Sequence, residues 1–104
     1  MSAPISMFVP ATLIAILAIP LALNLVPPNR IYGYRSAHSL ANRQLWFRIN
    51  RVAGLALIVA AAVALSAYLY RPELASGRSF AGVLVLILPV LAALVGTGMY
   101  ARKI

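Results

Sequence analysis

The sequence predicts an all-α transmembrane protein of three helices, and three observations support this fold class. The chain is 63% hydrophobic, only 10% of its residues are charged, and its mean hydropathy is +0.95. A soluble domain normally has about a quarter charged residues, so this chain cannot cover a water-facing surface. Its apolar residues also gather into three long stretches. At 104 residues, the chain is expected to form a single domain, residues 1–104.

The first span is expected over residues 5–26, which contain no charged residue. At about 1.5 Å per residue, this segment is long enough to cross a hydrocarbon core of about 30 Å. A cleaved signal peptide starts with a basic region, whereas the first basic residue here is Arg30, so we expect a retained span. Pro10 and Pro20 are expected to kink the helix or to act as a hinge. Pro27-Pro28 is expected to end it.

A basic hairpin over residues 27–51 follows, with five of the chain's nine basic residues. Gly33 is expected to permit a tight loop conformation there. Ser36 or Ser39 is expected to cap the second helix, which has no stop signal before Tyr70. The first third of this helix is amphipathic, so we expect it to extend into the cytoplasmic interface. Its remainder, residues 52–70, is the second span.

Polar and small residues of the second helix recur at every fourth position and wind gradually round one side, namely Asn42, Trp46, Asn50 and Gly54. Gln44, Arg48 and Arg51 share another face. Trp46 is expected to anchor the helix at headgroup level, with a stacking surface as the alternative. Gly54 has no side chain and is expected to leave room for the returning loop.

The third span is expected over residues 80–100, after a break at Arg71-Pro72-Glu73. Ala92 and Gly96 lie one turn apart, a spacing that lets membrane helices pack closely. Residues 101–104 are expected to form a basic tail. With three spans, the hairpin and the tail lie on one side and carry seven basic residues against two on the other. This asymmetry predicts the N-terminus outside and the C-terminus in the cytoplasm.

The inventory of reactive residues argues against an enzyme. Glu73 is the only acidic residue, His38 is the only histidine, and there are no cysteines. A carboxylate pair or a metal site cannot be built from this set, and no predicted span contains an ionisable residue for a proton relay. We therefore expect no cofactor and no metal. The net charge of +8 is better explained by topology and anionic lipid headgroups than by nucleic acid, because no basic face on a soluble fold is left.

The basic hairpin is the candidate site, because guanidinium groups pair with phosphates and carboxylates and Asn side chains both donate and accept. Asn29, Asn42 and Asn50 are expected to bond either loop backbone or a ligand. One interpretation is that the arginines only orient the chain and touch lipid phosphates. The other is a pocket for an anionic headgroup or a peptide. The candidate ligand- or partner-binding residues are Asn29, Arg30, Gly33, Tyr34, Arg35, Trp46, Asn50 and Arg51.

We further expect Asn29, Arg35 and Asn50 to form one polar cluster that folds the Gly33 turn back against the second helix. Unsatisfied polar groups near the membrane are costly, so a loop rich in donors should be paired internally. Arg35→Ala would then disturb the protein more than Arg43→Ala, since Arg43 is expected to contact lipid only.

The order Asn29, Gly33-Tyr34-Arg35-Ser36, Trp46, Asn50 and Gly54 resembles the SdpI/YfhL family of small bacterial integral membrane proteins, with Ser36 where Thr is usual. The resemblance implies a helical protein of the bacterial inner (plasma) membrane with no known enzymatic activity. The best-known member has a longer chain. It protects its producer against a secreted toxic peptide and also signals by sequestering a repressor at the membrane.

The residues and the resemblance together lead us to expect an immunity or signalling protein, or an accessory subunit, that binds a peptide toxin or a membrane-protein partner through residues 29–54. The alternative is a small binder or carrier of an anionic lipid or amphiphile at the inner leaflet. A homo-oligomer is also expected, because three spans offer little interior in which to satisfy loop polar groups.

Overall fold

The computed structural model describes residues 6–29, 31–33, 40–76 and 80–103. All regular structure in these residues is helical, which confirms the predicted class. α3 and α4 are each long and apolar enough to cross a membrane, whereas α1, with 15 residues, is a shorter apolar helix. The elements are α1 (Phe8–Ala22), α3 (Arg43–Tyr70), the 3-10 helix η1 (Pro72–Ser76) and α4 (Phe80–Lys103).

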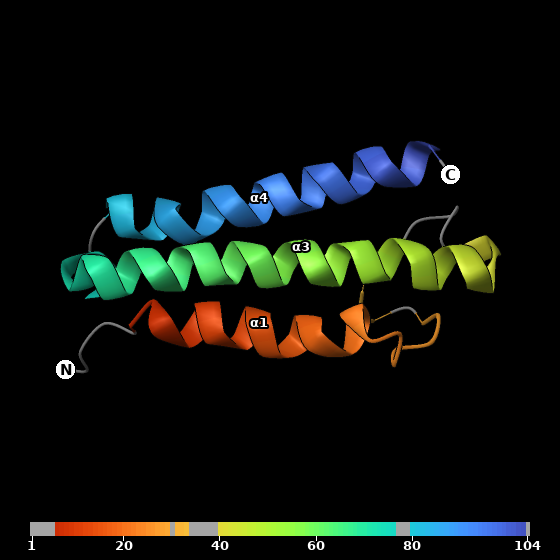
Figure 1. The fold of residues 1–104 in the computed structure, drawn as a ribbon, viewed down its shortest axis with the longest axis horizontal. Coiled ribbons are helices and arrows are strands. Elements are labelled where there is room, and N and C mark those ends of the chain that lie inside the picture. Colours follow the sequence, from red (N-terminus) through yellow and green to blue (C-terminus); the bar gives the residue numbers. More distant parts are fainter. Residues whose placement is uncertain (1–5, 30, 34–39, 77–79, 104) are drawn as a thin grey trace.

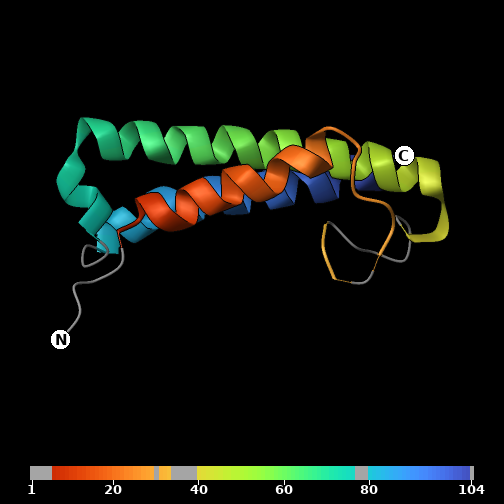
Figure 2. The ribbon, with the colours of Figure 1, turned by 90° about the horizontal axis from the view of Figure 1, so that it is seen from below.

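The long helix α3 lies at the centre, and α1 and α4 both pack along it, running antiparallel to it (Figure 1). With 28 residues, α3 is about 42 Å long, longer than a hydrocarbon core of about 30 Å. The end of α1, the start of α3 and the end of α4 lie together, with the loop of residues 26–33 beside them (Figure 2). We call this the basic end, because it carries Arg43, Arg48, Arg51, Arg102 and Lys103.

The opposite end is held together by contacts around Tyr68. The Tyr68 hydroxyl donates to the carbonyl oxygen of Gly82 at 2.7 Å, and its ring meets Phe8 edge-on at 5.7 Å between centroids. The backbone N–H of Met7 donates to the Ala75 carbonyl oxygen at 2.8 Å, which ties the start of α1 to η1. Arg71, the one described arginine at this end, pairs with Glu73 at 2.8 Å. The described charges of this end therefore cancel.

The first helix ends at Ala22 and not at residue 26, so the predicted bound is wrong. Asn24 adopts a left-handed conformation (φ 60°). The N–H of Leu25 then donates to the Pro20 carbonyl oxygen at 2.9 Å, and the N–H of Asn24 to that of Leu21 at 3.3 Å. This is the hydrogen-bond pattern of a Schellman C-cap, in which Asn is the usual substitute for Gly.

The two prolines of α1, Pro10 and Pro20, have different effects on the helix. Pro10 lies in the first turn, where the backbone N–H has no intrahelical partner to lose. The expected kink at Pro10 is therefore wrong. Pro20 lies inside the helix near its end, where its carbonyl accepts the bond that closes the C-cap.

The second helix begins at Arg43, because Asn42 is extended (φ −143°, ψ 125°) and interrupts any helix before it. The Asn42 side chain accepts from the amides of the first helical turn at 2.8 and 3.2 Å, as an N-cap does. An uninterrupted helix from Ser36 or Ser39 to Tyr70 is thus wrong, because Leu40 and Ala41 are helical but Asn42 is not. Both serines lie outside the described residues, so the cap expected of them stays a prediction. The predicted end is confirmed at Tyr70, since a residue before proline avoids the α region.

Two expectations about α4 are wrong. The helix continues to Lys103, so the basic tail is mostly the last helical turn, where positive charge complements the helix dipole. Ala92 and Gly96 face outward: both are exposed, and a side chain added at Gly96 would meet nothing within 4 Å. The close helix packing expected of them does not occur within this chain.

Candidate functional site

The loop after α1 is shaped by the side chain of Asn29. Its Oδ1 accepts from the backbone N–H groups of Ile31 at 2.9 Å and Tyr32 at 2.7 Å. Its Nδ2 donates to the Pro27 carbonyl oxygen at 2.8 Å. Asn29 therefore satisfies loop backbone, one of the two roles expected of it. A single amide organises the turn that carries Ile31 outward.

Trp46 holds this loop against α3. The indole is fully buried, with 0% exposed, and its Nε1 donates to the Val26 carbonyl oxygen at 2.7 Å. The side chain of Asn50, 1% exposed, donates from Nδ2 to the Trp46 carbonyl oxygen at 3.0 Å. The expected headgroup anchor at Trp46 is therefore wrong, because the ring is covered by the chain's own loop.

Gly33 lies directly on these two side chains. A Cβ at Gly33 would lie 2.8 Å from Oδ1 of Asn50 and 3.2 Å from the Trp46 ring, and its φ of +107° disfavours any other residue. The predicted folding of the Gly33 turn onto the second helix is confirmed. We call Val26, Gly33, Trp46 and Asn50 the Trp46 cluster.

The predicted polar cluster of Asn29, Arg35 and Asn50 stays a prediction, although bonds of two of its members are described. Asn29 bonds its own loop, whereas Asn50 bonds the Trp46 carbonyl. The role of Arg35 stays a prediction, because Arg35, together with Arg30, Tyr34 and His38, lies outside the described residues. Arg43 lies over the ring of Phe47 at 5.3 Å, a cation–π arrangement that lipid contact alone would not give.

The predicted polar face of α3 is confirmed, since Gln44, Arg48 and Arg51 are all exposed. The role expected of Gly54 is wrong. A Cβ there would lie 2.5 Å from the backbone nitrogen of Ala22 and 2.7 Å from the Ala18 carbonyl oxygen. The backbone of α1 therefore fills the space left by Gly54. Small residues on both helices allow this approach. The returning loop instead contacts α3 at least one helical turn before Gly54, at Asn50 and Trp46.

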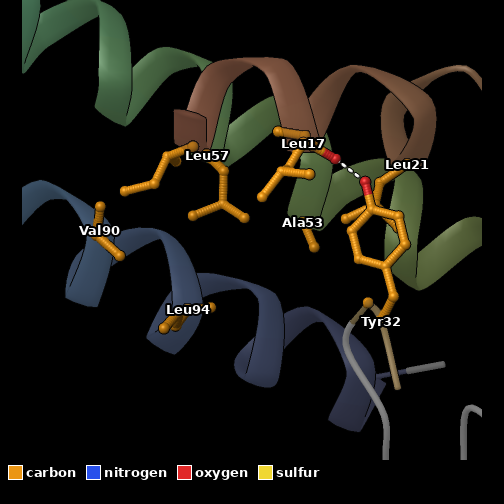
Figure 3. Close-up of a pocket in the computed structure, with 10 residues that line it drawn as sticks. Leu17, Leu21, Tyr32, Ala53, Leu57, Val90 and Leu94 are labelled. Carbon is orange, nitrogen blue, oxygen red and sulfur yellow. Dashed lines mark hydrogen bonds between the residues drawn. The ribbon is translucent and has the colours of Figure 1, made fainter. Parts of the chain in front are cut away.

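A cleft of about 470 Å³ opens between α1, α3 and α4, next to the loop (Figure 3). Its walls are aliphatic, and Tyr32 and Gly33 lie at its end towards the loop. The Tyr32 hydroxyl donates to the carbonyl oxygen of Leu17. Partial burial raises the pKa of Tyr32 above its ordinary value of 10.0, so the hydroxyl stays protonated and keeps donating at physiological pH. The lining residues are Ile14, Leu17, Ala18, Leu21, Tyr32, Gly33, Ala53, Leu57, Val90 and Leu94.

Sequence reasoning missed this cleft and the part of Tyr32 in it. Each helix is apolar on most sides, so a periodic pattern does not reveal which side chains three helices will share.

The charge of the two ends differs strongly. Among the described residues the basic end has no carboxylate, because Glu73, the chain's only acidic residue, lies at the opposite end. There the hydrogen bond from Arg71 lowers the pKa of Glu73 below its ordinary value, so the Glu73 carboxylate stays ionised at neutral pH. The described residues of the basic end therefore carry a net positive charge.

Comparison with protein-family models matches residues 25–100 to the SdpI/YfhL protein family. This range begins just after α1 and contains the loop, the Trp46 cluster, all of α3 and α4 as far as Tyr100. No match was found among curated proteins or among solved structures. Since the matched range covers well over half of the chain, and α3 and α4 are long and apolar enough to cross a membrane, this membrane protein belongs to the SdpI/YfhL family.

Proposed function

We propose that this membrane protein acts without catalysis, by binding a peptide or a membrane-protein partner at the loop of residues 26–33 and the adjoining start of α3. The observation that carries the proposal is the exposure of Ile31. This side chain is 90% exposed, although the loop that presents it is hydrogen-bonded by Asn29 and held by Trp46. A surface already held in its binding shape loses little conformational entropy when a partner binds.

The neighbouring face of α3 supports the same proposal. Arg48 and Arg51 are exposed there, and no described carboxylate at this end neutralises them. Arginine pairs bidentately with carboxylates and is enriched at protein interfaces. A partner with an apolar residue flanked by acidic groups fits this combination. Within the family, a toxic peptide and a membrane-bound regulator are the two classes to test first.

We also propose that the basic end faces the cytoplasm. Five described basic residues lie at this end, whereas the described arginine of the opposite end is paired with Glu73. Basic residues near the ends of transmembrane segments favour the cytoplasmic side. In this orientation a toxic peptide from outside would reach the loop only after entering the membrane.

Cysteine labelling of intact cells tests the orientation. The chain has no native cysteine, so Ile31→Cys and Tyr70→Cys each introduce a single thiol. Both positions are well exposed, at 90% and 84%, and they lie at opposite ends of α3. A membrane-impermeant reagent is expected to label Tyr70→Cys from outside and Ile31→Cys only after lysis. The reverse pattern would overturn the orientation.

Partner binding is tested by truncating Ile31. Burial of an aliphatic side chain contributes about 1.5–3 kcal/mol, and about 1.4 kcal/mol corresponds to a tenfold change in affinity. We therefore expect Ile31→Ala to reduce the co-purified partner about tenfold or more in native membrane particles, as measured by quantitative mass spectrometry. Tyr70→Ala, at the opposite end, is the control and should retain it. Equal retention by the two variants would exclude the loop as the binding surface.

A further inference from the structure

We propose that the cleft beside Tyr32 is a binding site for one acyl chain of an anionic membrane lipid, whose headgroup lies at the basic end. This site is separate from the loop surface around Ile31 and does not depend on partner binding there. The two lie on different sides of the loop. Tyr32 and Gly33 line the cleft, whereas Ile31 is turned outward.

The dimensions of the cleft suit a single chain. Its volume of about 470 Å³ is within the range of about 300–1,000 Å³ typical of small-molecule sites. The lining side chains follow one another along the helices, from Val90 and Leu57 to Tyr32 (Figure 3). Such a cleft, with walls from three helices, can hold an extended hydrocarbon chain along the helices.

The lining chemistry excludes a polar occupant. No charged residue lines the cleft, and the Tyr32 hydroxyl is already bonded to the Leu17 carbonyl. Among the described residues no buried side-chain polar atom lacks a partner. A peptide inserted here would bring backbone N–H and C=O groups that the walls cannot pair, which is costly in a bilayer. An acyl chain brings none.

The surrounding charge selects an anionic headgroup. The end of α4 that lies at the basic end carries Arg102 and Lys103, and both are exposed. Arg102 is exposed on α4, about 12 Å along the helix from Leu94 at 1.5 Å per residue. No described carboxylate lies at this end to compete for them. Basic residues at this level attract anionic lipid headgroups, so a chain in the cleft would place its phosphate near Arg102 and Lys103 of α4.

Photolabelling of the intact chain tests the proposal. The protein is reconstituted in nanodiscs of phosphatidylcholine with a small fraction of phosphatidylglycerol that carries diazirines along one acyl chain, and the labelled residues are mapped by mass spectrometry. We expect labelling of Leu21, Leu57 and Leu94, which line the cleft, to exceed that of the outward-facing Val59 and Val95 several-fold. Moving the diazirines to the phosphatidylcholine should remove the excess. Even labelling of all five positions, or no preference for the anionic lipid, would overturn the proposal.

Substitutions then separate the cleft from the lipid-facing surface. Leu57→Trp fills the cleft and should abolish the excess labelling at Leu94, whereas Val59→Trp, whose native side chain is 62% exposed, should leave it unchanged. Excess labelling of Leu94 that survives in a folded Leu57→Trp protein would contradict the site. If that variant does not fold, the positions labelled in the wild-type protein test the proposal on their own.

A second copy of the chain is the competing occupant. Because the chain has no cysteine, oxidation of Leu94→Cys reports directly on contacts between copies at the cleft. Disulfide-linked dimers from Leu94→Cys, but not from Val95→Cys, would overturn the lipid assignment. We expect the Leu94→Cys and Val95→Cys variants to form disulfide-linked dimers to the same extent.

Discussion

Replacing Trp46 by alanine is expected to lower the free energy of unfolding by about 3–5 kcal/mol, the usual cost of removing a large buried aromatic side chain. The ring is fully buried, lies against Gly33 and donates to the carbonyl of Val26. Its removal leaves a cavity between α3 and the loop and deprives the Val26 carbonyl of its donor. The expected decrease in the free energy of unfolding therefore includes both lost packing and a lost hydrogen bond.

Two further variants separate these contributions. Trp46→Phe keeps most of the ring and loses the Nε1 hydrogen bond, a bond that typically contributes about 1 kcal/mol, so its effect should lie well below that of Trp46→Ala. Phe47→Ala is the neighbouring control, because Phe47 is only half-buried. Unfolding is followed by circular dichroism in mixed micelles, since Trp46 is the chain's only tryptophan. A Trp46→Ala effect no larger than that of Phe47→Ala would contradict the buried cluster.

The Trp46 cluster also links stability to the proposed binding surface. Ile31 is displayed by a loop that is held from beneath by Trp46 and shaped by Asn29. Loss of the indole should therefore weaken partner binding even though Ile31 itself is unchanged. Asn29→Ala, which removes three hydrogen bonds within the loop, should weaken binding with a smaller effect on global unfolding.

Much of this arrangement was predictable from the sequence, for physical reasons. Proline at position 72 fixes the end of α3. The helical spacing of polar residues identifies the exposed face with Arg48 and Arg51. Gly33 could be placed against α3, because a glycine in a polar loop and a small, polar face on the following helix fit together. Each of these inferences depends only on residues close together in sequence.

The remaining features depend on which elements meet, and the sequence does not specify that. A tryptophan near a membrane interface is more often a lipid anchor, and only the course of the loop shows that Trp46 is covered. Asn24 ends α1 in a left-handed conformation, which few non-glycine residues adopt. Gly54 was placed on the correct face of α3, but α1 occupies its space rather than the loop. The cleft could not be predicted either, because its walls come from three helices whose relative positions the sequence does not specify.

Substitution of Gly54 is the second change that we expect to reduce stability strongly. A Cβ at Gly54 would lie 2.5 Å from the Ala22 nitrogen and 2.7 Å from the Ala18 carbonyl oxygen. These are backbone atoms of α1 and cannot rotate away, so α1 must shift as a whole. Overpacking costs about 1–3 kcal/mol, and contacts this short with backbone atoms place the cost in the upper part of that range. The gain from replacing glycine by alanine within a helix is only about 1 kcal/mol. Gly54→Ala should therefore be destabilising, and Gly54→Val more so.

Gly96 is the matched control, because it also lies inside a helix, α4, but meets nothing within 4 Å. Gly96→Ala keeps the gain in helix propensity and carries no steric cost, so its melting temperature in detergent should equal or exceed that of the wild type. The same substitution thus has opposite expected signs at the two glycines. A shift of α1 would also displace Ala18 and Leu21 from the cleft, so Gly54→Ala should reduce photolabelling at Leu94 while Gly96→Ala should not. Equal melting temperatures for the two variants would show that α1 and α3 do not approach each other at Gly54.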